Sequence, residues 1–124
     1  MGICFGKQNF NVPEPELQPW EKRGMLNIKK LVGWGNCYFY LSSNKLEYWD
    51  SKNACLLYGD GKRQDIIPLK GLSIEQVEKD GKSCYNFTTM PYKDTYILYH
   101  EDAAVMDSWI QQIKYDLLFY YKVS

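Results

Sequence analysis

The sequence carries no excess of charge of either sign and almost no histidine. Its 124 residues include 15 Lys and Arg, 15 Asp and Glu, and one histidine, His100. A net charge of zero argues against non-specific nucleic-acid binding, which depends on a marked positive excess. His100 has no nucleophile motif around it, and the sequence has no phosphate-binding glycine loop, so we expect neither an enzyme nor a cofactor.

The four cysteines lack the paired spacing that a zinc or redox site requires. Cys37 and Cys84 lie in apolar, strand-like runs, where a buried free thiol is the usual outcome. We therefore expect no metal site and a reducing compartment. The sequence also lacks the run of roughly 18 apolar residues that a transmembrane helix needs, and its N-terminus lacks the long apolar core of a secretory signal.

The chain begins with the sequence MGICFGK, and residues 1–7 have features of an acylation segment. Gly2 behind the initiator methionine is the residue that N-myristoylation requires, and Cys4 is placed for S-palmitoylation. Gly6 stands where Ser or Thr is preferred, which weakens the match. A single myristoyl chain binds membranes only marginally, so stable residence needs a second anchor. The alternative is that the Met-Gly start occurs by chance.

Residues 8–19 are predicted to form an extended linker, because they contain three prolines and few large apolar side chains. A folded domain is predicted over residues 20–121. Within it, β-patterned runs alternate with turns, and strands are predicted at 22–29, 36–42, 45–49, 65–69, 73–77, 83–88 and 95–100. Residues 50–64 are predicted to be a long, glycine-punctuated loop. About seven short strands are typical of a sandwich or a small barrel.

The period of the apolar pattern changes after Glu101 and Asp102, which are suited to begin a helix. The apolar residues then follow at spacings of three and four, at Met106, Trp109, Ile113, Leu117 and Tyr120. These spacings place them on one face of a helix, and we expect Trp109 to pack in the core. The fold is therefore predicted to be mainly β with one C-terminal α-helix.

The loop predicted at 29–36 combines positive charge with large apolar side chains. Lys29 and Lys30 lead into Leu31, Val32 and Trp34. A loop tip usually carries small polar residues, whereas basic and apolar side chains together suit contact with a membrane surface. The alternative is that Val32 and Trp34 fold back beneath the hairpin.

In the order and spacing of its motifs, residues 22–121 resemble the pleckstrin homology (PH) domain family. The matching runs are Gly24-Met25-Leu26, Trp34 with Phe39-Tyr40-Leu41, Leu46-Glu47-Tyr48-Trp49, Ile66-Ile67-Pro68-Leu69, and Trp109 with Ile110 and Ile113. This resemblance implies a barrel of two near-orthogonal antiparallel sheets with the helix closing one end. It also implies that the loops at the other end, the first above all, receive a phosphorylated lipid headgroup. We expect a monomer.

With its N-terminal glycine, cysteine and linker, the whole chain resembles the acylated PH-domain proteins of apicomplexan parasites. That resemblance implies a lipid-anchored protein on the cytoplasmic face of apical secretory organelles, the micronemes. There it would sense phosphatidic acid and control exocytosis.

One departure from the family pattern narrows the expected ligand. Phosphoinositide-binding members pair a lysine late in the first strand with a basic–x–basic motif that opens the second. Here Lys29 and Lys30 supply the first part, but the second falls on Gly35 and Cys37, which carry no positive charge. A multiply phosphorylated inositol ring would lose much of its charge-assisted binding, whereas a phosphomonoester needs fewer donors. The sequence therefore permits phosphatidic acid and argues against a tight inositol-polyphosphate site.

The candidate site residues fall into two sets. Leu31, Val32 and Trp34 are the candidates for membrane insertion. The headgroup candidates are Lys29 and Lys30 first, then Arg23, Lys22, Lys52, Lys62, Arg63 and Lys93. Each basic residue near an anionic surface contributes about 1 kcal/mol. Two alternatives remain, a phosphoinositide-binding PH domain and a protein-interaction adaptor whose partner the sequence does not identify.

Overall fold

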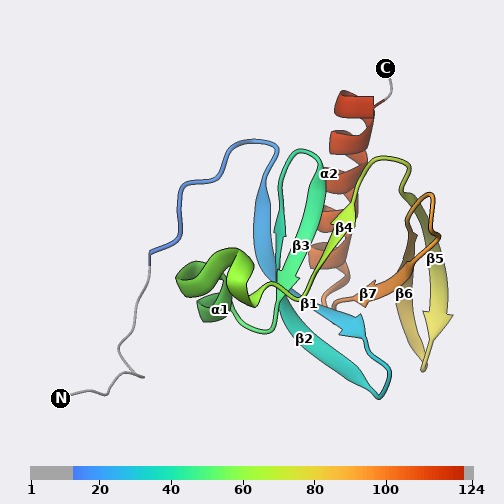
Figure 1. Cartoon of the computed structure of the whole chain (residues 1–124). Helices are drawn as coiled ribbons and strands as arrows, with labels where there is room; N and C mark the ends of the chain where they lie inside the picture. The colour runs from blue at the N-terminus through green and yellow to red at the C-terminus, as the bar shows by residue number, and fades with distance from the viewer. Residues whose placement is uncertain (1–12, 122–124) are drawn as a thin grey trace.

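The computed structural model describes residues 13–121, which form seven strands and a long C-terminal helix (Figure 1). The strands are β1 (Lys22–Lys29), β2 (Trp34–Leu41), β3 (Lys45–Trp49), β4 (Asp65–Pro68), β5 (Ser73–Lys79), β6 (Lys82–Thr88) and β7 (Thr95–Tyr99). The helices are α1 (Lys52–Tyr58), the short 3₁₀ helix η2 (Gly59–Lys62) and α2 (Ala103–Tyr121). The predicted class, mainly β with one C-terminal helix, is confirmed.

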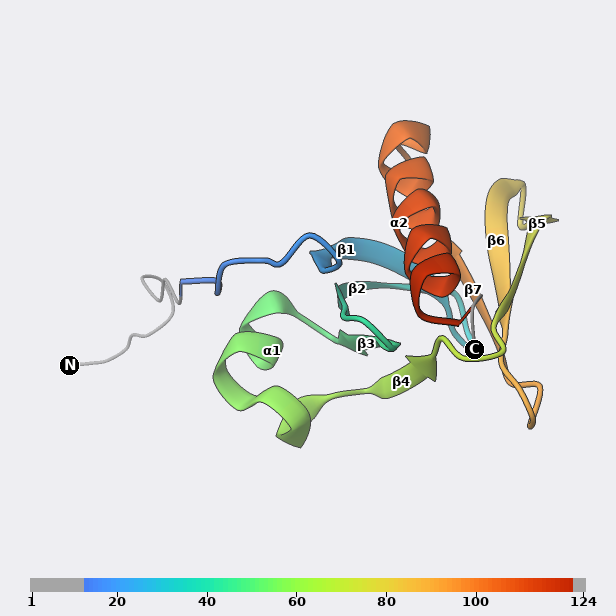
Figure 2. The same ribbon diagram turned by 90° about the horizontal axis from the view of Figure 1, so that it is seen from above.

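The strands form one antiparallel sheet in the order β4-β3-β2-β1-β7-β6-β5. The expectation of two separate sheets is wrong in this respect, because β1 pairs with β7 at Asn27–Tyr99 and Ile28–Leu98. These two pairs join the groups β1–β4 and β5–β7 into a continuous, strongly bent sheet. In both ribbon views α2 lies between the two groups (Figures 1 and 2).

The core lies between the sheet and α2, as the helical spacing predicts. Met106, Trp109 and Ile113 are buried, and Leu117 packs against the same cluster. The Trp109 indole passes close to Gly24 of β1, where a Cβ atom would lie 3.4 Å from Cζ2 of the ring. A glycine at this position lets the indole lie directly against the strand. Trp109, which was predicted to be a core residue, therefore packs α2 against β1.

The prediction of a loop over residues 50–64 is wrong, because the chain forms α1 and η2 there. Ser51 is the N-cap of α1, and its hydroxyl accepts a hydrogen bond from the Ala54 amide at 3.0 Å. Gly59 ends the helix with a positive φ of 52°. None of the residues of α1 is buried, so the helix has no apolar periodicity in the sequence.

Residues 13–19 contain no strand or helix, yet Glu14 is fixed to the domain. Its carboxylate lies 3.1 Å from the ammonium of Lys52 and accepts a hydrogen bond from the Tyr38 hydroxyl at 3.1 Å. The bond to Lys52 lowers the pKa of Glu14 below its usual value. Residues 8–12 of the predicted linker lie outside the described residues, and an extended form for them stays a prediction.

One acidic side chain is buried in the C-terminal half of α2. Asp116 is fully buried, and its Oδ1 accepts a hydrogen bond from Gln112 at 3.1 Å, while Oδ2 has no partner. Burial raises the pKa of Asp116 from 3.8 to about 6. Because the folded state binds the proton more tightly than the unfolded chain, stability falls as the pH rises from about 4 to 6.

Asp116→Asn should remove this pH dependence and raise the free energy of unfolding at pH 7 by about 1–2 kcal/mol. Urea unfolding of the full chain at pH 4, 5, 6 and 7 measures both effects. Asp107→Asn, at an exposed position of the same helix, is the matched control and should leave the pH profile unchanged. A variant profile parallel to that of the wild type would contradict the assignment.

Candidate functional site

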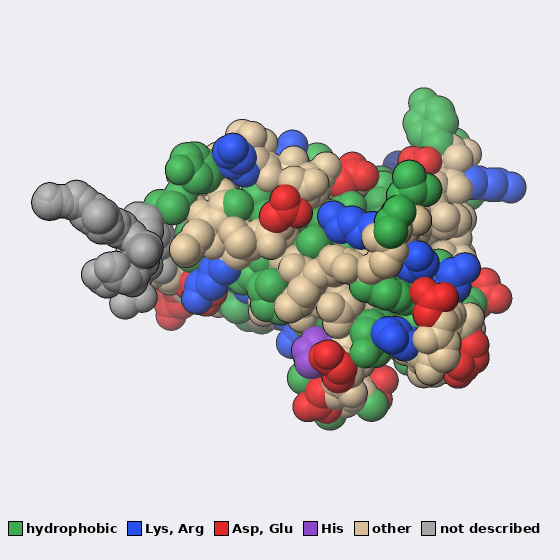
Figure 3. Space-filling view, turned by 90° about the horizontal axis from the view of Figure 1, so that it is seen from below, with side chains coloured by type: hydrophobic (Ala, Val, Ile, Leu, Met, Phe, Trp, Pro, Cys, Tyr) green, Lys and Arg blue, Asp and Glu red, His purple; other side chains and the backbone are tan. Residues whose placement is uncertain are grey.

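The β1–β2 connection is a tight turn with two apolar side chains at its tip. The Lys30 amide donates to the Gly33 carbonyl at 3.0 Å, and Gly33 has the positive φ of 75° that this closure requires. Leu31 is 100% exposed and Val32 is 89% exposed. In the view from below, basic and hydrophobic side chains gather together on this end of the molecule (Figure 3). Val32 therefore does not fold back beneath the hairpin.

The two lysines that flank the turn lie on opposite faces of the hairpin. Lys29 pairs in register with Trp34, and its ammonium lies 6.0 Å from the centroid of the Trp34 ring. Lys30 instead lies over Gly35, where a Cβ atom would stand 2.5 Å from the Cε of Lys30. The Lys29 ammonium also donates to the Lys30 and Gly33 carbonyls of the turn, at 3.2 Å and 3.4 Å. Trp34 and Gly35 are successive residues of β2 and point to opposite faces, so the two lysine side chains lie on opposite sides of the hairpin.

The Lys29 face is built around two aromatic rings. Trp34 and Tyr99 meet edge to face with centroids 5.5 Å apart, and the Trp34 indole N–H donates to Asp80 at 3.1 Å. The Lys82 ammonium lies 5.4 Å from the centroid of the Tyr99 ring. Trp34 is thus a strand residue packed against the β5–β6 turn and β7, and it does not stand at the tip with Leu31 and Val32.

Sequence reasoning missed the side chains that complete this face. Asp80 and Lys82 belong to the β5–β6 hairpin, and Asp80 is 46 positions from its partner Trp34. Tyr99 ends β7 and reaches the hairpin only because β7 pairs with β1. No local sequence pattern indicates these contacts, since each depends on strand order in the sheet.

The Lys30 face carries a negative charge beside the lysine. The Lys30 ammonium lies 3.9 Å from the carboxylate of Asp50, which also accepts a hydrogen bond from Gln64 at 3.4 Å. Gly35 and the buried Cys37 add no positive charge, and burial raises the pKa of the Cys37 thiol. Asp50 would repel a phosphate bound by Lys30, so this face is a weak site for a polyanion.

Among the remaining candidates, two are held in ion pairs. Arg63 donates to Glu47 at 2.8 Å and to Asp60 at 2.7 Å. Glu47 is only 5% exposed, so Arg63 neutralises a buried carboxylate. Lys52 pairs with Glu14 as described above. Arg63 and Lys52 therefore each form an ion pair with a carboxylate of this chain.

The other four candidates do not lie at the exposed β1–β2 turn either. Three lie over aromatic rings, at centroid distances of 4.2 Å for Arg23 over Tyr40, 5.4 Å for Lys22 over Trp109 and 5.6 Å for Lys62 over Tyr58. Lys93 lies in the β6–β7 loop. Of the eight basic candidates, only Lys29 and Lys30 flank the exposed turn.

Two further observations concern residues 13–121 alone. No helix in this range is long and apolar enough to cross a membrane. Over the same residues, no group of three or more His, Cys, Asp or Glu side chains is arranged to hold a metal ion.

Comparisons with known proteins identify the family to which the chain belongs. The model of the PH domain family matches residues 20–117, so the chain belongs to the PH domain family. PH domains are generally binding modules that attach to phospholipid headgroups or proteins. A PH domain-containing protein of Dictyostelium discoideum is 29% identical over 117 residues, which cover 91% of this chain. The match spans only 24% of that larger protein.

Solved structures agree on the fold. The PH domain of the human KIAA0053 protein superposes with a TM-score of 0.62 at 21% identity, covering 90% of this chain and 93% of that domain. The C-terminal PH domain of pleckstrin, solved in complex with D-myo-Ins(1,2,3,4,5)P5, gives a TM-score of 0.60 at 21% identity over 77% of this chain and 95% of that one. At these identities the likeness shows the fold alone.

Arg63→Ala should destabilise the domain by about 2 kcal/mol, because it leaves the buried Glu47 carboxylate without its closest partner. Denaturant unfolding of the full chain measures the loss. Lys62→Ala, at the neighbouring exposed position, is the control and should change stability by less than about 0.5 kcal/mol. Equal stability of the two variants would show that Arg63 has no structural role.

Proposed function

We propose that this PH domain is a non-enzymatic, peripheral membrane-binding module whose β1–β2 turn enters an anionic bilayer. The observation that carries the proposal is the full exposure of Leu31 and the near-full exposure of Val32 directly after two lysines. Moving one such side chain from water into an apolar phase is worth about 1.5–3 kcal/mol. The closed turn presents both side chains without any change of backbone.

Phosphatidic acid is the proposed headgroup. Lys29 and Lys30 stand on opposite faces of the hairpin, so each meets a separate lipid, and a small phosphomonoester fits such single-lysine contacts. On the outer face Lys82 lies over the Tyr99 ring, and the Asp80 carboxylate lies against Trp34. A large inositol polyphosphate would need several cations on one side, where this hairpin offers Gly35, Cys37 and Asp50. These features favour several small headgroups over one large one.

The test is sedimentation of the unacylated full chain with phosphatidylcholine vesicles that contain phosphatidic acid, phosphatidylserine or a phosphatidylinositol bisphosphate at matched charge. Phosphatidic acid should give the tightest binding. Leu31→Ser with Val32→Ser should weaken binding at least tenfold, since both apolar anchors are lost. Lys29→Gln or Lys30→Gln should each weaken it about fivefold.

Matched controls lie on α2, which runs away from the hairpin (Figure 1). Leu118→Ser replaces an exposed leucine in the last turn of the helix, and Lys114→Gln replaces an exposed lysine. Both should bind vesicles as the wild type does. Equal binding to phosphatidic acid and phosphatidylserine would reduce the function to general electrostatic attachment. Preference for the bisphosphate would favour the phosphoinositide alternative.

The proposal includes double acylation at Gly2 and Cys4, which lie outside the described residues. By the resemblance described above, the acylated protein would act as a monomer on the cytoplasmic face of secretory organelles and control their exocytosis. The acyl chains would keep the protein on the membrane for longer than the apolar turn alone, because a single weak anchor dissociates readily.

In eukaryotic cells that express the full chain, Gly2→Ala should abolish incorporation of a myristate analogue and move the protein from the membrane to the soluble fraction. Cys4→Ser should keep the myristate label and lose stable membrane residence. Membrane retention of the Gly2→Ala variant without any label would contradict the acylation hypothesis.

A further inference from the structure

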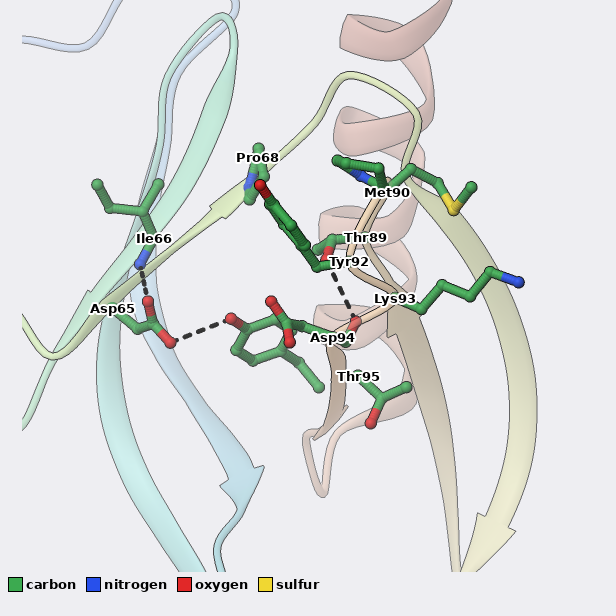
Figure 4. Close-up of a pocket in the computed structure, with 11 residues that line it drawn as sticks. Asp65, Ile66, Pro68, Thr89, Met90, Tyr92, Lys93, Asp94 and Thr95 are labelled. Atoms are coloured by element: carbon green, nitrogen blue, oxygen red, sulfur yellow. Dashed lines mark hydrogen bonds between the residues drawn. The ribbon is translucent and has the colours of Figure 1, made fainter.

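A groove of about 680 Å³ opens between β4 and the loop that joins β6 to β7 (Figure 4). Asp65, Ile66 and Pro68 form one side, and residues 89–96 form the other. The loop is closed on itself, because the buried Thr89 donates from its amide to the Asp94 carbonyl at 2.9 Å and from its hydroxyl to the same oxygen at 3.4 Å. These hydrogen bonds fix the loop that forms one side of the groove.

The groove is negatively charged. Asp65 and Asp94 extend into the same space, whereas Lys93 points away from it (Figure 4). Asp65 accepts hydrogen bonds from the Tyr96 hydroxyl at 3.0 Å and from the Ile66 amide at 2.8 Å. The Asp94 carboxylate has no ion pair or hydrogen bond among the described residues. Burial, then Asp65, and then Asp94 raise the pKa of the Tyr96 phenol.

Exposed apolar side chains adjoin the acidic groups. Tyr92 is 84% exposed and Met90 is about half exposed, both on the rim formed by the loop. An exposed aromatic side chain beside two carboxylates offers packing and charge to the same ligand. This combination repels phosphate and suits a ligand that is both basic and apolar.

We propose that this groove binds a short basic segment of a protein partner, with one arginine side chain between Asp65 and Asp94 and a neighbouring apolar side chain against Tyr92. A guanidinium group presents planar N–H donors that bind carboxylates and stack on aromatic rings. A quaternary ammonium lipid headgroup has no N–H donor for the free Asp94 carboxylate, so the chemistry favours a peptide. This site is independent of the proposed membrane contact.

The position of the groove allows both contacts at once. The β6–β7 loop lies well away from the β1–β2 tip in Figure 1 and projects to one side of the molecule in Figure 2. A domain attached to a bilayer through the tip would keep the groove open to a protein. The inferred role is therefore recruitment of a basic partner segment to the membrane.

The test is an NMR titration of the ¹⁵N-labelled full chain with acetyl-Leu-Arg-Leu-amide and with the same peptide carrying citrulline, the uncharged isostere of arginine. The arginine peptide should shift the amide signals of residues 65–66 and 89–96, and citrulline should weaken binding at least fivefold. Asp94→Asn should produce a comparable loss without unfolding, because its carboxylate has no partner in the domain.

Asp107→Asn, on α2 and away from the groove, is the matched control and should bind the arginine peptide as the wild type does. Equal affinity for the two peptides would overturn the proposal, as would shifts centred elsewhere or none at all. Shifts of residues 89–96 caused by inositol hexakisphosphate would also overturn it, since an acidic groove should exclude a polyanion.

Discussion

The antiparallel register of β1 and β2, from Lys22 opposite Leu41 to Lys29 opposite Trp34, determines most of what this domain presents to its surroundings. A shift by one residue would exchange every side chain between the core face and the outer face. In the observed register Leu26, Ile28 and Phe39 are buried. The same alternation places Lys29 with the Trp34–Tyr99 pair and Lys30 over Gly35 at the core-facing side.

The sequence predicted the seven strands and α2 because their patterns have periods that a core imposes. It did not predict α1, which depends on the Ser51 cap and buries none of its residues. It also did not predict the pairing of β1 with β7, which joins residues about seventy positions apart and makes the sheet continuous. Long-range pairing leaves no local pattern, and α1 leaves no apolar period because none of its residues is buried.

The site was predicted in part for the same reasons. Lys29, Lys30, Leu31 and Val32 were placed at the turn because two lysines and large apolar residues occur together between two strand-like runs. β2 begins at Trp34 instead of residue 36, so the hairpin extends far enough for Lys29 to pair with Trp34 and for Lys30 to lie over Gly35. Each face also carries a carboxylate from a distant segment, Asp50 after β3 and Asp80 in the β5–β6 turn, and only the fold locates them.

Although the net charge is zero, the domain has two surfaces of opposite charge. The β1–β2 turn carries two exposed apolar side chains directly after two lysines, and the groove beside β4 carries two carboxylates with an exposed tyrosine. In the two proposals, opposite charges on separate surfaces would direct the domain to an anionic membrane on one side and to a basic protein segment on the other. In the proposed arrangement the first surface holds the domain on the bilayer and the second remains open to a partner.

Insertion of the turn is tested most directly by paramagnetic broadening of amide signals of the unacylated full chain on nanodiscs. The nanodiscs contain phosphatidic acid and a lipid with a spin label in its acyl chain. The signals of residues 31–33 should broaden most, while those of the last turn of α2 stay sharp. Broadening centred on another surface, or none at the turn while the protein is bound, would contradict membrane attachment through the β1–β2 hairpin.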